Sequence, residues 1–164
     1  MLDLGKKSIL GIGISAVDYE SAVAKIIGAS KNRNAFGVSA LAVHGVMVGF
    51  MDPEHKRRLN GLELVTPDGQ PVKWALNILH KTGLKDRVYG PDLTLKTLTA
   101  AEKEKLPVYF YGATKDILNK LVVNLRKKFP NLEIAGYEPS KFRKISLDEK
   151  KDVVERIKAS GAKI

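Results

Sequence analysis

The stretch Val65-Thr66-Pro67-Asp68-Gly69-Gln70-Pro71 decides how the rest of the chain is interpreted. Residues 62–65 before it predict a buried strand, and the apolar pattern of residues 72–79 after it predicts a helix with Pro71 as its first residue. A carboxylate at the carboxyl end of a sheet strand lies where open α/β sheets bind their ligands. Asp68 is therefore a candidate functional residue, and Gly69 leaves room for a ligand to approach the backbone.

A simpler interpretation of Asp68 stays open at this point. Aspartate is a favoured residue at the N-cap of a helix, and aspartate-glycine is an ordinary turn pair. The sequence by itself does not separate a carboxylate that caps the following helix from one that acts on a ligand.

Composition limits the class of protein. With 164 residues, of which 44% are hydrophobic, the chain is predicted to form one domain over residues 1–164. The absence of cysteine excludes disulfides, thiolate catalysis and cysteine-bound metals, and a reducing cytoplasm is the expected location. The 28 Lys and Arg against 18 Asp and Glu give a formal charge of +10, which favours anionic partners.

Strand and helix patterns alternate along the chain. Strands are expected at residues 9–14, 36–40, 62–65, 107–111 and 132–137, with helical patterns between them. The connections are short, and the strands expected late in the chain have the continuous apolar pattern of buried strands. Together these features predict an α/β fold with a mostly parallel sheet and helices on both faces, a Rossmann-like arrangement. Residues 161–164 resemble the beginning of one more strand, so we expect the chain to be truncated at its carboxyl end.

Helix starts are predicted at three polar residues. Asp52 followed by proline is an N-cap, Asp92 is expected to cap the helix that follows it, and Ser146 with Glu149 forms a capping box. The glycines of residues 11–16 formally fit a dinucleotide-binding motif, but they lie within a strand pattern and are not followed by the acidic residue that the motif requires.

Histidine and basic residues give weaker signals. His44, His55 and His80 lie in separate segments, so no metal site is predicted, and His44 is either a core residue or part of a pocket wall. The lysine-rich helix faces lack interleaved aromatic residues, which argues against nucleic-acid binding. Residues 140–144, with Phe142 between basic residues, fit either a phosphate or membrane contact or an ordinary basic loop.

Three stretches together resemble one protein family. They are residues 65–71, the segment Arg87-Val88-Tyr89-Gly90-Pro91-Asp92-Leu93, and residues 108–112 followed by a helix, Pro130 and a strand that ends in Gly136-Tyr137. This pattern resembles the bacterial WecG/TagA/CpsF glycosyltransferases over roughly residues 8 to 164. Such enzymes transfer a sugar, often N-acetylmannosamine, from a UDP-sugar to a sugar on a polyprenyl diphosphate, with inversion and without a metal or other cofactor.

The resemblance also implies roles for individual residues. Asp68 matches the catalytic base, Arg87 the arginine that contacts the diphosphate, and Ser39 a pocket position where threonine is common. The other implied substrate-binding positions are Gly69, Gln70, Gly90, Asp92 and Gly112. Leu41 stands where asparagine is often found, so His44 is a further candidate for sugar recognition. The family's later Gly-x-Pro-x-Gln-Glu motif and basic membrane-contacting segment would lie beyond Ile164.

Two functions remain open from the sequence. The first is a glycosyltransferase of cell-wall, teichoic-acid or exopolysaccharide biosynthesis, peripheral at the inner face of the bacterial cell membrane and homo-oligomeric. The second is a non-catalytic α/β module that binds a nucleotide or phosphate. They are distinguished by whether Asp68 and Arg87 face a common cleft.

Overall fold

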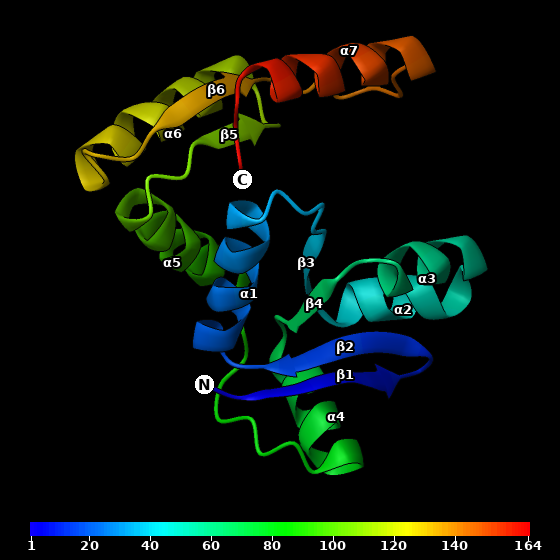
Figure 1. Cartoon of the computed structure of the whole chain (residues 1–164). Coiled ribbons are helices and arrows are strands. Elements are labelled where there is room, and N and C mark those ends of the chain that lie inside the picture. The colour runs from blue at the N-terminus through cyan, green and yellow to red at the C-terminus, as the bar shows by residue number, and fades with distance from the viewer. The chain divides into compact units, whose positions relative to one another are not determined.

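The computed structural model describes all 164 residues and divides them into two compact units, Met1–Thr97 and Leu98–Ile164. We describe each unit by itself (Figure 1). The elements of the first are β1 (Asp3–Ile9), β2 (Ile12–Val17), α1 (Tyr19–Lys31), β3 (Val38–Leu41), α2 (Val43–Met51), α3 (Pro53–Asn60), β4 (Leu64–Pro67), α4 (Gln70–His80) and the start of α5 (Gly90–Lys103). Those of the second are the end of α5, β5 (Val108–Tyr111), α6 (Lys115–Lys128), β6 (Ile134–Glu138) and α7 (Leu147–Ala159).

The amino-terminal unit begins with an antiparallel hairpin, β1 and β2 (Figure 1). The expectation of one strand over residues 9–14 was wrong, because the chain reverses at Leu10 and Gly11, whose φ angles are 52° and 82°. Two successive residues with positive φ suit the right-handed twist of a two-residue hairpin. The glycine-rich motif of residues 11–16 therefore lies in a hairpin turn and strand, and a dinucleotide-binding loop is not formed.

Strands β3 and β4 form the parallel pair that carries Asp68. Their register places Ser39 opposite Val65 and Leu41 opposite Pro67, so both strands end at the same edge. The ladder continues one residue further, because the Asp68 N–H donates to the Leu41 carbonyl at 3.2 Å. Strand β2 packs along β4, where the Ser15 hydroxyl accepts from the Val65 N–H at 3.1 Å.

The core of this unit is built from strand residues that point inward and from one face of each covering helix. Ile12, Ile14, Val65 and Leu76 are fully or almost fully buried, and they form a cluster with residues of β3, α2, α3 and α4. Burial of apolar surface on this scale is the main stabilising contribution to such a unit. The same core fixes the end of β4, since all four of its residues are buried.

The carboxy-terminal unit contains the second parallel pair, β5 and β6, as the sequence predicted (Figure 1). Helix α6 begins at Thr114, whose hydroxyl accepts from the Ile117 N–H at 3.5 Å, and the capping box at Ser146 is confirmed at the start of α7. Helix α7 has no buried residue, but Val153 and Ile157 are half-buried, and polar contacts also attach the helix to the unit. One of these is a two-pronged ion pair in which Arg156 donates to Glu138 at 2.7 and 2.9 Å.

The last residues lie beside β5. The Tyr109 N–H donates to the Ile164 carbonyl at 2.8 Å, and the Lys163 N–H donates to the Pro107 carbonyl at 2.8 Å. The Val108 N–H donates in the other direction, to Glu133 of the segment that leads into β6. These bonds hold the last residues beside β5, but residues 161–164 form no strand, and the sheet that contains β5 consists of β5 and β6.

The fold class is thus confirmed as α/β, with two parallel pairs compatible with a Rossmann-like arrangement. The structure adds an antiparallel pair that was not expected. That residues 1–164 form a single domain, truncated at its carboxyl end, stays a prediction. None of the helices combines the length and apolar character needed to span a membrane.

Candidate active site at the end of strand β4

Asp68 is not the cap of α4. The N-cap residue is Gly69, which has no side chain to accept a hydrogen bond, and Pro71 is the second helical residue. No N–H of the first turn of α4 is bonded to the Asp68 carboxylate, so the capping interpretation was wrong. With glycine at the N-cap, the start of α4 lacks the few tenths of a kcal/mol that a capping side chain would add.

Gly90 brings a second segment against Asp68. A Cβ atom on Gly90 would lie 3.6 Å from Asp68 Oδ2 and 3.1 Å from the Ala40 Cβ. The start of α5, the end of β3 and the carboxylate after β4 therefore meet at one edge of the sheet, where a side chain at position 90 would press against Ala40. The segment before Gly90 runs beside β4, because the Val88 N–H donates to the Pro67 carbonyl at 2.9 Å.

Arg87 lies on this same segment and pairs with no carboxylate. Its guanidinium carbon is 4.6 Å from the centre of the Tyr89 ring, a cation–π contact that orients the side chain without neutralising its charge. The Tyr89 N–H in turn donates to the Tyr19 hydroxyl at 2.9 Å. Arg87 is thus held by neighbouring groups and keeps its donors available for an anion.

Tyr19 is a site residue that the sequence did not reveal. Its hydroxyl accepts from Tyr89 and lies 3.5 Å from an Asp92 carboxylate oxygen, so the first residue of α1 fixes the turn that carries Arg87 and Gly90. Burial, followed by the nearby Asp92 charge, raises the pKa of Tyr19. Its partners are about seventy residues away in sequence, and no local pattern signals such a contact. Asp92 lies in the first turn of α5 and does not cap it, because the helix already starts at Gly90.

The remaining predicted positions fall in three places. Gly69 and Gln70 lie at the start of α4, next to the start of α2, since a Cβ on Gly69 would be 3.7 Å from the Val43 nitrogen. His44, the second residue of α2, is exposed, so its interpretation as a core histidine was wrong. Ser39 lies two residues before the end of β3, and strand alternation directs its side chain to the face opposite Ala40.

Gly112 belongs to the carboxy-terminal unit, where it follows β5 with a φ of 136°. Its N–H donates to the Glu138 carbonyl at 3.0 Å, which joins the carboxyl ends of β5 and β6. In the nearby loop of residues 140–144, Lys141 and Arg143 both donate to Glu149 at 2.6 Å. These bonds, first from Arg143 and then from Lys141, hold the pKa of Glu149 far below its usual range. Both basic groups are therefore paired with a carboxylate in the first turn of α7.

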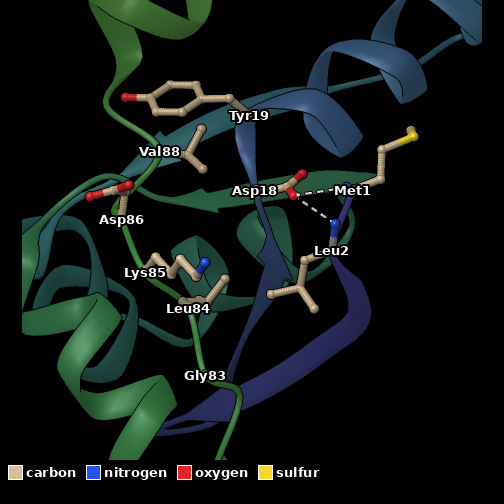
Figure 2. Close-up of a pocket in the computed structure, with 9 residues that line it drawn as sticks. All are labelled: Met1, Leu2, Asp18, Tyr19, Gly83, Leu84, Lys85, Asp86 and Val88. Atoms are coloured by element: carbon tan, nitrogen blue, oxygen red, sulfur yellow. Dashed lines mark hydrogen bonds and ion pairs between the residues drawn. The ribbon is translucent and has the colours of Figure 1, made fainter.

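A pocket of about 370 Å³ lies beside the Arg87 segment in the amino-terminal unit (Figure 2). It is formed between residues 1–2 and 18–19 on one side and residues 83–86 and Val88 on the other, and Arg87 is not part of its wall. Its Asp18 accepts from the Leu2 and Ser21 N–H groups at 2.6 and 2.8 Å. Burial raises the pKa of Asp18, but these backbone bonds hold it below its usual value, so this carboxylate is already used in the fold.

Comparison with known proteins identifies the class. Residues 7–164 match the model of the WecG/TagA/CpsF family of glycosyl transferases, so the chain belongs to this family. Over 130 residues it is 29% identical to an N-acetylglucosaminyldiphosphoundecaprenol N-acetyl-beta-D-mannosaminyltransferase of Bacillus spizizenii, which covers 79% of this chain and 48% of that enzyme.

An enzyme of the same name from Bacillus subtilis is 33% identical over 79 residues, covering 48% of this chain and 30% of the relative. The chain thus spans at most about half the length of these curated relatives.

Proposed function

We propose that this chain carries the base and donor-binding residues of a metal-independent, inverting glycosyltransferase. It would move N-acetylmannosamine or a related hexose from a UDP-sugar to a sugar linked to a polyprenyl diphosphate, at the inner face of the bacterial cell membrane. The family and the names of the relatives support the reaction class. The observation that carries the proposal is Asp68, a carboxylate at a strand end that caps no helix and faces a glycine.

The reaction assigns one role to each of two residues. Asp68 takes the proton from the acceptor hydroxyl while the oxygen of that hydroxyl attacks the anomeric carbon of the donor. The bond from this carbon to the diphosphate breaks in the same step. The electron pair leaves with UDP, and the anomeric configuration is inverted. Arg87 donates to the diphosphate and compensates the charge that develops on it, an interaction that strengthens as the bond breaks.

Asp68→Asn tests the base. Asparagine keeps the size of the side chain and cannot take the proton, so transfer should fall by about 100-fold or more, while UDP binding and the unfolding midpoint change little. The measurement is transfer from a UDP-sugar to a short-chain polyprenyl-linked acceptor, in a version of the protein that shows turnover. An Asn variant with near-normal turnover would overturn the assignment.

Arg87→Lys tests the diphosphate contact. Lysine keeps the charge but loses the two-pronged geometry, so UDP affinity measured by titration calorimetry should fall about tenfold. Unchanged UDP affinity would contradict the role of Arg87. A version extended past Ile164 that binds UDP but transfers no sugar from any UDP-hexose would favour the alternative function, a non-catalytic nucleotide-binding module.

A further inference from the structure

Tyr19, the first residue of α1, joins that helix to the segment that leads into α5. Its hydroxyl accepts from the Tyr89 N–H at 2.9 Å and lies 3.5 Å from an Asp92 carboxylate oxygen. The Lys96 ammonium group lies 5.4 Å from the centre of its ring, which is a cation–π contact. One side chain of α1 thus contacts residues from the turn before α5 to the second turn of that helix.

The segment before α5 is attached to β4 at Val88. The Val88 N–H donates to the Pro67 carbonyl at 2.9 Å, and the Thr66 hydroxyl donates to the Val88 carbonyl at 3.4 Å. Val88 is fully buried, whereas Tyr89 is exposed. The bond from the Tyr89 N–H to Tyr19 therefore fixes the first residue after this attachment, where the chain leaves β4 and enters α5.

The Tyr89 ring supports Arg87. The guanidinium carbon of Arg87 lies 4.6 Å from the centre of that ring. An arginine side chain has many rotamers, and the need to order such a side chain on binding reduces affinity for a ligand. A ring that is held in place before the ligand arrives removes part of this cost. The position of the Tyr89 backbone therefore affects how readily Arg87 binds an anion.

The protonation of Tyr19 suits both of its contacts. Burial raises its pKa, the bond from the Tyr89 N–H lowers it, and the charges of Asp92 and Arg87 act in opposite directions, so that the pKa is raised in sum. The phenol is therefore protonated at neutral pH, and it can donate to Asp92 while a lone pair accepts from the Tyr89 N–H. Both contacts need the hydroxyl, and phenylalanine can form neither.

We propose that Tyr19 is a positioning residue for Arg87. Its hydroxyl holds the Tyr89 backbone, the Tyr89 ring holds the guanidinium, and Arg87 is thereby oriented before the diphosphate binds. Tyr19 acts through Tyr89 and contacts none of the reacting atoms. The inference rests on the proposed function, since the diphosphate of UDP is the anion that Arg87 would bind.

Tyr19→Phe tests the positioning, because it removes the hydroxyl and keeps the ring. Its affinity for UDP, measured by titration calorimetry, should fall about three- to tenfold. Its affinity for uridine, measured by NMR titration, should not change, because uridine lacks the diphosphate. Unchanged UDP affinity would overturn the proposal. An equal loss for both ligands would also overturn it, because it would indicate a general disturbance of the fold.

Arg87→Lys shows whether Tyr19 acts through Arg87. The double variant Tyr19→Phe/Arg87→Lys should bind UDP about as weakly as Arg87→Lys alone, whereas independent effects would multiply. A double variant whose loss is the product of the two single losses would overturn this route.

Tyr109→Phe is the matched control. The Tyr109 hydroxyl donates to Glu138 at 3.5 Å in the carboxy-terminal unit, so this variant also removes one tyrosine hydroxyl but none that touches the Arg87 segment. UDP affinity should be unchanged. A loss as large as that of Tyr19→Phe would contradict the assignment to Tyr19.

Hydrogen exchange tests the positioning without a ligand. The Tyr89 amide should exchange faster in Tyr19→Phe than in the unaltered chain, because its acceptor is removed. Equal exchange in the two chains would overturn the proposal. The same measurement separates the proposal from the proposed function. If the unaltered chain binds no UDP, the proposed function fails, and exchange of the Tyr89 amide still decides whether Tyr19 holds the segment.

Discussion

The turn after β4 and the turn after β5 have the same chain order but different chemistry. In each, a parallel strand is followed by a short turn that contains glycine and then by a helix. After β5 the helix is capped by the Thr114 hydroxyl, whereas after β4 the cap is Gly69, and the neighbouring Asp68 carboxylate is not used. Because the Asp68 carboxylate forms no hydrogen bond with the helix start, it is a candidate for a functional role.

The glycines of the two turns also serve different purposes. Gly112 has a φ of 136° with nothing near its missing Cβ, so it is needed for the backbone conformation. Gly69 has an ordinary φ of −85°, and a Cβ there would touch Ala42 and Val43 at normal contact distance. Gly112 is required by the backbone conformation, while Gly69 leaves space at the edge where we propose that the ligand binds.

Gly112→Ala should have the largest effect on stability. Forcing a side chain into this backbone conformation should lower the free energy of unfolding by about 1–3 kcal/mol, measured by urea denaturation. Gly28→Ala is the control, because Gly28 lies in α1 with open space around it, and alanine should there stabilise by about 0.5–1 kcal/mol. Similar effects of the two substitutions would contradict the conformational role of Gly112.

Thr114→Ala and Asp68→Ala should separate the two turns. Loss of the Thr114 cap should cost about 1 kcal/mol of unfolding free energy, and hydrogen exchange should locate the loss at the start of α6. Asp68→Ala removes no cap, so its unfolding midpoint should be close to that of the unaltered chain. A destabilisation by Asp68→Ala as large as that by Thr114→Ala would show that Asp68 has a structural role.

Gly69→Ser should make the first turn more like the second. A serine hydroxyl at the N-cap of α4 should stabilise the chain by a few tenths of a kcal/mol, seen as a higher thermal midpoint. The added side chain occupies the space beside Asp68, so UDP affinity or transfer should decrease. A gain in stability with unchanged ligand binding and turnover would show that Gly69 is not at the ligand-facing edge.

The smallest expected effect concerns acid. Hydrogen bonding from Arg156 holds the pKa of Glu138 below its usual value, so this pair stabilises the chain above the unfolded pKa of the carboxyl group. The contribution is lost as the pH falls through the folded pKa, when Glu138 is protonated. Arg156→Met should therefore reduce the thermal midpoint slightly at neutral pH and not at strongly acidic pH. A difference that persists in acid would exclude the ion pair as its cause.

The sequence by itself determined those features that depend on neighbours along the chain. Periodicity over a few residues predicts the strands β4, β5 and β6 and the α/β class. The chemistry of helix caps predicts the Asp52 cap of α3 and the capping box at Ser146. The same local signals placed a carboxylate at the end of β4. They also led to the error at Leu10 and Gly11, because Leu10 in the turn continues the apolar pattern between Ile9 at the end of β1 and Ile12 at the start of β2.

Only the tertiary structure shows that Asp68 does not cap α4, and only the tertiary structure shows which residues surround it. From the sequence, its carboxylate was readily explained as a helix cap, and the structure excluded this by placing the helix start at Gly69 and Gln70. The approach of Gly90 and the Tyr19 contact join segments more than twenty and about seventy residues apart. Contacts of this kind depend on how a buried core orients its elements, and periodicity along the chain contains no information about them.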